Sequence, residues 1–192
     1  MDPGVKIGQF RTSVAPGGLR LVQELVNTTL AGHRDDPGRD QLADPATATG
    51  WAVAVLGLWA ENTGAPRPET GITPGGLPSL RTLREDLRVR LRASAPNIDA
   101  PPAHEPGPGY SAEVRLALDP GGRARYEGGL VALVLAEVLL AQTTGTWPRL
   151  KTCAAPACGV CFYDASPNRS RVWHDTKTCG NLANLHASRA RK

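Results

Sequence analysis

The feature that most constrains this chain is a cluster of metal-binding residue types near its C-terminal end. All four cysteines of the 192-residue chain lie between positions 153 and 179, and with one histidine they give the spacing Cys-x4-Cys-x15-His-x4-Cys. A disulfide framework would spread its bridges over the domain that it staples, so clustered cysteines indicate metal. Two donor pairs separated by a loop of this size suit a closed, structural zinc site. The sequence therefore predicts one Zn²⁺, bound by Cys153, Cys158, His174 and Cys179.

Two other residues compete for places in this donor set. Cys158 and Cys161 form a second Cys-x2-Cys pair, but Cys161 stands in an apolar run beside Val160 and Phe162, which favours a buried core thiol. His186 follows Cys179 by seven residues and is the other candidate, as a replacement for His174. A segment of about 40 residues buries too little apolar surface to fold alone, so zinc is expected to supply its folding free energy, on the order of 10 kcal/mol.

The preceding 150 residues contain mostly helical patterns. Apolar residues at helical spacing predict an amphipathic helix over 19–30, and Asp44 followed by Pro45 predicts a capped helix that continues through the apolar stretch 51–59. Leucines three and four residues apart predict a helix over 79–92, with Ser79 as its cap and its arginines on the face opposite the leucines. Pro-rich loops at 62–78 and 95–109 separate these segments.

One short hairpin interrupts the helical patterns. Residues 112–118 alternate apolar and polar side chains, and Asp-Pro-Gly-Gly at 119–122 supplies turn chemistry before 123–126. The stretch 129–142 is almost wholly apolar and predicts a buried helix, in which Glu137 needs a partner. We therefore expect an α+β protein, with a predominantly helical N-terminal domain over 1–150 that includes the hairpin, and a small zinc module over 151–192.

The net positive charge is confined to the zinc module. Residues 151–192 carry seven Lys or Arg and two Asp, whereas residues 1–150 carry 15 basic and 16 acidic side chains. Such a cationic module could lie along a phosphate backbone or could be a solvated surface with a basic end. The candidate nucleic-acid contacts are Arg169, Arg171, Lys177, Asn181, Arg189, Arg191 and Lys192. Asn181 could pair with an adenine edge or could close the turn after Cys179.

The same residues resemble a known family. The segment resembles the CGNR zinc finger of presumed bacterial stress-responsive transcriptional regulators. The residues that carry the resemblance are, in order, Cys153-x4-Cys158-x3-Phe162-x-Asp164-x-Ser166-x-Asn168-Arg169-x-Arg171-x-Trp173-His174-x4-Cys179-Gly180-Asn181. Two positions depart from that pattern. His174 stands where the family has a cysteine after the tryptophan, and Leu182 replaces the arginine of Cys-Gly-Asn-Arg.

A weaker resemblance extends upstream. The N-terminal region is similar to the ABATE domain that accompanies this finger. The similar residues are Leu25-Val26-Asn27-Thr28, then Asp40-x-Leu42 and Trp51. Asn27 and Thr28 could line a ligand pocket or could serve a hydrogen-bond network at a helix end. The resemblance implies a sensor-like helical domain, holding an effector or a partner, coupled to a finger that binds double-stranded DNA.

Other classes of function find less support in the sequence. No phosphate-binding glycine loop, nucleophile elbow, His-Glu-x-x-His motif or convincing Ser, His and Asp set is present, so we do not expect an enzyme. A zinc-stapled module for protein partners is the alternative to a DNA reader. No apolar run approaches the roughly 20 residues that span a bilayer, and no secretory signal pattern opens the chain, so we expect a cytoplasmic protein without membrane contact.

Overall fold

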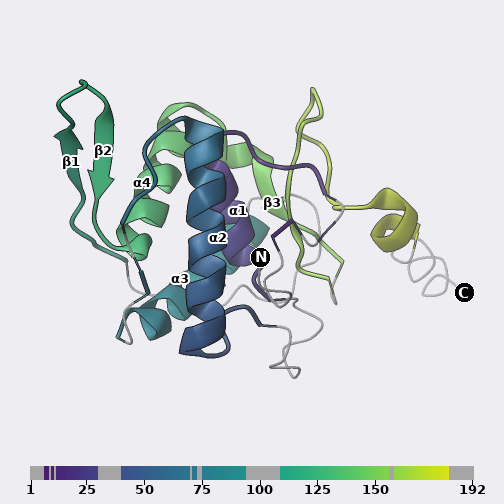
Figure 1. The fold of residues 1–192 in the computed structure, drawn as a ribbon. Helices are drawn as coiled ribbons and strands as arrows, with labels where there is room; N and C mark the ends of the chain where they lie inside the picture. Colours follow the sequence, from purple (N-terminus) through teal and green to yellow (C-terminus); the bar gives the residue numbers. More distant parts are fainter. Residues whose placement is uncertain are drawn as a thin grey trace, which may run out of the picture.

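The fold is a helical body with a two-stranded hairpin on one side and a small C-terminal module on the other (Figure 1). The computed structural model describes residues 7–8, 10, 12–29, 40–69, 71–72, 75–93, 109–155 and 158–181. In these ranges the helices of the body are α1 (Leu19–Val26), α2 (Pro45–Thr63), α3 (Gly76–Ala93) and α4 (Leu130–Thr143). Mixed helix and strand, with a predominantly helical N-terminal region, confirm the predicted class.

The short helix α1 is the centre of the body. It contacts α2, α3 and α4, and its apolar side chains from Leu19 to Val26 are buried, as are Gln23 and Glu24. The predicted segment 19–30 is thus shorter as a helix than expected, since α1 ends at Val26 and residue 30 lies outside the described ranges. Around α1 the largest fully buried side chains include Trp51, Leu56, Leu80, Leu83, Leu91 and Leu133.

The capped entry to α2 is confirmed. The Asp44 carboxylate accepts hydrogen bonds from the backbone N–H groups of Ala46 and Thr47 at 2.9 and 3.0 Å, and Pro45 takes the first helical position. The helix ends at Thr63 and is followed by Gly64, whose φ of 70° is the left-handed conformation that glycine adopts without a steric penalty.

Helix α4 is the predicted apolar helix, buried except near its end, where Leu139 and Leu140 are exposed, and Glu137 has the partner that it needs. Its carboxylate Oε1 accepts a hydrogen bond from the Trp59 indole Nε1 at 2.7 Å, and burial raises the pKa of Glu137. The same carboxylate lies against Gly18 at the start of α1, where an added Cβ would stand 2.0 Å from Glu137 Cδ. Only glycine fits between α1 and α4 at this position.

Helix α3 corrects two predictions. It begins at Gly76, so Ser79 is inside its first turn and is not the cap, because Pro78 fits a first turn where its missing N–H is not needed. The arginines are not all on a solvent face either. Arg84 and Arg88 are buried.

The two buried arginines hold the end of α1. Arg84 forms a bidentate ion pair with Asp40 at 2.6 and 3.1 Å and donates to Thr28 Oγ1 at 3.0 Å. Arg88 Nη2 donates to the carbonyls of Val26 and Thr29 at 2.6 and 3.0 Å. Carbonyls at the last turn of a helix have no partner within that helix, and α3 supplies these partners for α1.

Two antiparallel hairpins complete the fold. β1 (Arg115–Leu118) pairs with β2 (Ala124–Glu127), which confirms the predicted hairpin. After α4 and the 3₁₀ turn η3 (Trp147–Arg149), β3 (Leu150–Thr152) pairs with β4 (Cys161–Tyr163). The π-helical turn η4 (Thr176–Gly180) follows. Since β3 packs on α3 and β4 packs on α1, the second hairpin attaches the C-terminal module to the body.

Candidate metal centre

Four side chains from three short segments converge at the base of the C-terminal module. The ligand atoms of Cys153, Cys158, His174 and Cys179 all lie within 4.8 Å of one another. His174 presents its Nδ1 atom, which lies 3.3 Å from the Cys158 sulfur and 3.5 Å from the Cys179 sulfur. The sequence prediction of the donor set is therefore matched by a three-dimensional cluster of the same four residues.

This cluster fits zinc. Zinc binds sulfur at about 2.3 Å and imidazole nitrogen at about 2.0 Å, so a tetrahedral ion would separate sulfur from nitrogen by about 3.5 Å. The two sulfur–nitrogen distances agree with this value. Three thiolates and one imidazole complete a tetrahedron without an open position, which defines a structural zinc site.

The electrostatics of the cluster favour a bound cation. The Cys158 thiol donates to Cys153, which lowers the pKa of Cys153 to about 4 and raises the pKa of Cys158. Burial raises the pKa of Cys179, and the neighbouring Cys153 thiolate raises it further. The three sulfurs thus oppose one another's ionisation, and a divalent cation relieves this conflict because it binds all of them as thiolates.

Local backbone contacts place the ligands. Cys153 follows β3, and its N–H donates to the Val160 carbonyl at 2.8 Å across the loop that carries Cys158. The N–H of Ala154 donates to the Val172 carbonyl at 2.9 Å, which brings the His174 segment alongside. Cys179 is in η4, which Asp175 caps: its carboxylate accepts hydrogen bonds from the N–H groups of Lys177 and Thr178.

The tryptophan beside His174 packs on the metal cluster. Trp173 contacts the buried group formed by Cys153, Phe162 and Cys179. A Cβ added to Gly180 would stand 3.2 Å from Trp173 Cδ1 and 3.2 Å from Thr176 Cγ2, so glycine allows η4 to lie close to the indole. Trp173 therefore covers the metal site, as a residue next to a ligand commonly does.

The rival donor Cys161 is not part of the cluster. Its side chain is fully buried in the core of the helical body, and burial raises the pKa of its thiol. The interpretation of Cys161 as a core thiol is thus favoured by its position. The other rival, His186, lies outside the described residues.

The sequence does not predict a buried ion pair that the structure shows within the C-terminal module. Lys151 Nζ donates to the Asp164 carboxylate at 2.8 Å, and both side chains are buried. Burial alone would raise the pKa of Asp164, but hydrogen bonds from Lys151, Ser166 and the Arg171 N–H bring it down to about 2. Lys151 also donates to the carbonyls of Arg169 and Arg171. The only sequence signal for this pair is the presence of Asp164 in the family pattern. Lys151 gives no signal, because a lysine in a basic segment is ordinarily a surface residue.

The proposed nucleic-acid contacts fall into three groups. Arg169, Lys177 and Asn181 are exposed around the metal cluster. Arg171 is engaged within the chain: its guanidinium donates to Ser13 Oγ at 3.1 Å and the His174 carbonyl at 2.8 Å, and lies over the Phe162 ring. Arg189, Arg191 and Lys192 lie outside the described residues.

The finger is bound to the helical body through polar contacts as well as packing. Asn27 donates from Nδ2 to the Cys161 carbonyl at 2.9 Å and accepts at Oδ1 from the Cys161 N–H at 2.8 Å. The Tyr163 N–H donates to the Ser13 carbonyl at 3.0 Å. Asn27 therefore extends the main-chain pairing of β4, and Thr28 beside it bonds Arg84. Both residues serve a helix-end network and not the cavity described next.

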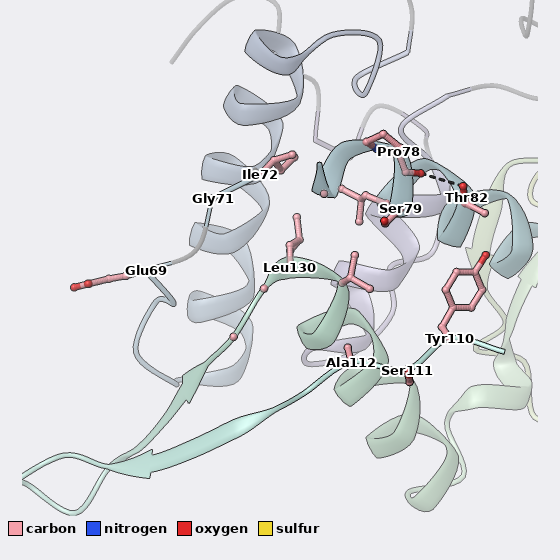
Figure 2. Close-up of a pocket in the computed structure, with 15 residues that line it drawn as sticks. Glu69, Gly71, Ile72, Pro78, Ser79, Thr82, Tyr110, Ser111, Ala112 and Leu130 are labelled. Carbon is pink, nitrogen blue, oxygen red and sulfur yellow. Dashed lines mark hydrogen bonds between the residues drawn. The ribbon is translucent and has the colours of Figure 1, made fainter. Parts of the chain in front are cut away.

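A separate cavity of about 750 Å³ opens at the other end of α3. Its walls are the loop before α3, the first turns of α3 and α4, and residues 110–112 (Figure 2). Ile72, Leu130 and Val131 supply apolar surface, while Ser79 and Tyr110 supply hydroxyl groups. Glu69 is the one ionisable carboxylate in the described lining, and Figure 2 shows it pointing outward. The volume is in the range of small-molecule sites.

Together, a closed Cys₃His donor set, two short β-strands and a capped turn define a small zinc-finger module attached to a helical body. Comparison with known families agrees: residues 149–192 match the CGNR zinc finger family. The match covers the C-terminal module and leaves the helical body unassigned. No curated protein matches the chain significantly. In the described residues, no helix has the length and apolar character to cross a bilayer.

Proposed function

We propose that the chain is a zinc-dependent, DNA-binding transcriptional regulator of the cytoplasm. In this proposal residues 151–192 contact double-stranded DNA, and residues 1–150 form an ABATE-like sensing domain. The observation that carries it is the arrangement of acidic and basic side chains in the finger. Both acidic side chains of residues 151–192, Asp164 and Asp175, accept hydrogen bonds from the finger itself, whereas Arg169 and Lys177 are exposed.

The zinc ion has a structural role in this proposal, and no catalytic step is assigned. Through Cys179, zinc would hold η4, which carries Lys177 and ends at Asn181, to the rest of the finger. Arg169 and Lys177 would neutralise phosphates, which gives affinity without sequence preference. Asn181, exposed at the end of η4, is the residue with the chemistry to read a base edge.

The proposed coupling between effector and finger runs along α3. An uncharged small molecule suits the cavity, because its walls are mostly apolar and the exposed Glu69 points away. The cavity contacts the first turns of α3, while Arg84 and Arg88 further along the same helix hold the end of α1. Asn27 at that end grips the backbone of Cys161 in the finger. A shift of α3 would therefore reach the DNA-binding module through directly bonded residues.

The test is the binding of zinc-loaded, full-length protein to a pool of genomic duplex fragments, titrated with salt and repeated after chelation. We expect selective binding that weakens with salt and is lost with zinc. Arg169→Ala should lower the salt slope by about 0.9, the value for one phosphate contact. Arg67→Ala is the matched control, since Arg67 is an exposed arginine of the body.

A zinc-stapled module for protein partners is the alternative. It would be favoured if the zinc-loaded protein ignored duplex DNA at low salt. The same result would remove the central step of the regulator proposal. Binding that Arg67→Ala weakens as much as Arg169→Ala would show instead that the DNA surface is not confined to the finger.

A further inference from the structure

The β1–β2 hairpin has one apolar face on which two leucines stay exposed, while Tyr126 on the same face packs against the core of the body. Residues with even numbers share this face, where Leu116 lies opposite Tyr126 and Leu118 lies opposite Ala124. The side chains of Leu116 and Leu118 are 71% and 73% exposed, the two highest values among the exposed large hydrophobic residues. Exposed apolar patches at such an element mark interaction surfaces.

The outer edge of the hairpin is open as well. Its sheet contains only β1 and β2 within the described residues, and β1 forms the side of the hairpin away from the body (Figure 1). The Asp119 N–H donates to the Arg123 carbonyl at 2.9 Å, so the alternation of an antiparallel ladder makes Ala117 the next residue bonded to β2. The main-chain groups of Leu116 and Leu118 therefore point to the free edge. Unpaired main-chain groups at an exposed sheet edge are a template for another strand, even at an edge as short as β1.

The sequence of β1 is complementary to itself about a twofold axis. With Ala117 on the axis, antiparallel pairing places Leu116 opposite Leu118 of a second copy. Those two residues carry the outward main-chain groups. The same register places Arg115 opposite Asp119 of the second copy, so opposite charges meet at both ends of the pair. Apolar side chains then form one continuous face across four strands, and the paired charges fall on the other face.

We infer that two copies of this chain associate through β1, in an antiparallel pair centred on Ala117. The charge pairing selects a second copy as the occupant, because Arg115 begins β1 and Asp119 directly follows it, so two antiparallel copies bring cation and anion together at both ends. The Asp119 Oδ1 atom accepts from the Arg123 N–H within the turn, which leaves Oδ2 for Arg115 of the second copy. A four-stranded sheet would also stabilise the hairpin, because two strands alone have marginal stability and only the Tyr126 end is packed against the body. This inference does not depend on DNA binding.

The first measurement is sedimentation of the zinc-loaded, full-length protein over a range of concentrations. We expect a monomer–dimer equilibrium. Leu116→Ser with Leu118→Ser removes four leucines from a symmetric interface and should weaken association at least about 100-fold. Val53→Ser is the control, because Val53 is an exposed apolar residue of α2, at 52% exposure. A monomer at all concentrations, or a dimer that the leucine variant does not weaken, would overturn the inference.

Cross-linking tests the register independently. Residues directly opposite in a non-hydrogen-bonded pair have Cα atoms about 4.5 Å apart, within reach of a disulfide. Ala117→Cys should therefore form a covalent dimer under mild oxidation, seen on a non-reducing gel. Arg115→Cys is on the same face of the same strand, but its two copies would be about 13 Å apart along the strands, so it should not cross-link. Equal cross-linking of both variants would contradict the centred pair.

Discussion

Replacement of Asn27 by alanine should destabilise the chain, because this side chain bonds both main-chain groups of Cys161. Asn27 is buried, and its amide donates to the Cys161 carbonyl and accepts from the Cys161 N–H. Alanine removes both bonds. The carbonyl keeps a partner, since Gln23 Nε2 also donates to it at 3.2 Å, but the N–H loses the partner that Asn27 provides.

The expected loss follows from these contacts. A net hydrogen bond contributes about 1 kcal/mol, and a buried donor without a partner costs about 1–3 kcal/mol. Asn27→Ala should therefore lower the free energy of unfolding by about 2–4 kcal/mol. With a urea m-value of about 2 kcal/mol/M, the midpoint should fall by about 1–2 M.

The assay is urea unfolding of the zinc-saturated protein, followed by circular dichroism and tryptophan fluorescence together. Asn62→Ala is the control, because Asn62 is exposed on α2 and its replacement should change stability by less than about 0.5 kcal/mol. Hydrogen exchange at the Cys161 amide should also become faster in the Asn27 variant. A midpoint equal to that of the wild type, with unchanged exchange at Cys161, would refute the reasoning.

Three further predictions concern the metal, the buried ion pair and the buried carboxylate. Removal of His174 takes one of four donors, so His174→Ala should weaken zinc affinity at least about 100-fold in competition with a chelator; unchanged affinity would contradict the donor set. Lys151→Met leaves Asp164 buried without its cation and should cost about 3–5 kcal/mol in urea unfolding; a loss below about 1 kcal/mol would argue against a buried pair. Burial raises the pKa of Glu137, so its carboxyl contributes stability at low pH that is lost as pH rises through the raised pKa. Glu137→Gln should therefore gain stability relative to the wild type as pH rises above the usual range of a glutamate pKa, and a difference that does not change with pH would contradict this.

The donor set and the helical segments could be predicted because both depend on local spacing. Zinc requires four donors within bonding distance, so short separations in the chain limit the possible sets, and the four predicted residues lie together. Helix α2 and the hairpin follow from caps and turns that act within a few residues, such as Asp44 before Pro45.

The burial of charged residues could not be predicted in the same way. Arg84 and Arg88 were expected on a solvent face because charge on a helix ordinarily marks its exposed side. In the fold, the end of α1 and Asp40 bring acceptors to that face. Whether an arginine is buried therefore depends on hydrogen-bond acceptors that distant segments supply. The periodicity of a single helix does not indicate where those acceptors lie.

The same limit applies to the proposed DNA surface, where Arg169 and Arg171 were assigned one role because they are alike in sequence. Arg169 has a left-handed backbone with φ of 51°, held by the bond from Lys151 to its carbonyl, and its side chain is exposed. Arg171, two residues later, joins Ser13 of the body to the carbonyl of the ligand His174. One arginine is available to an external phosphate, and the other positions the metal site. The charge of the finger is therefore divided between holding the zinc segment in place and presenting a cationic surface.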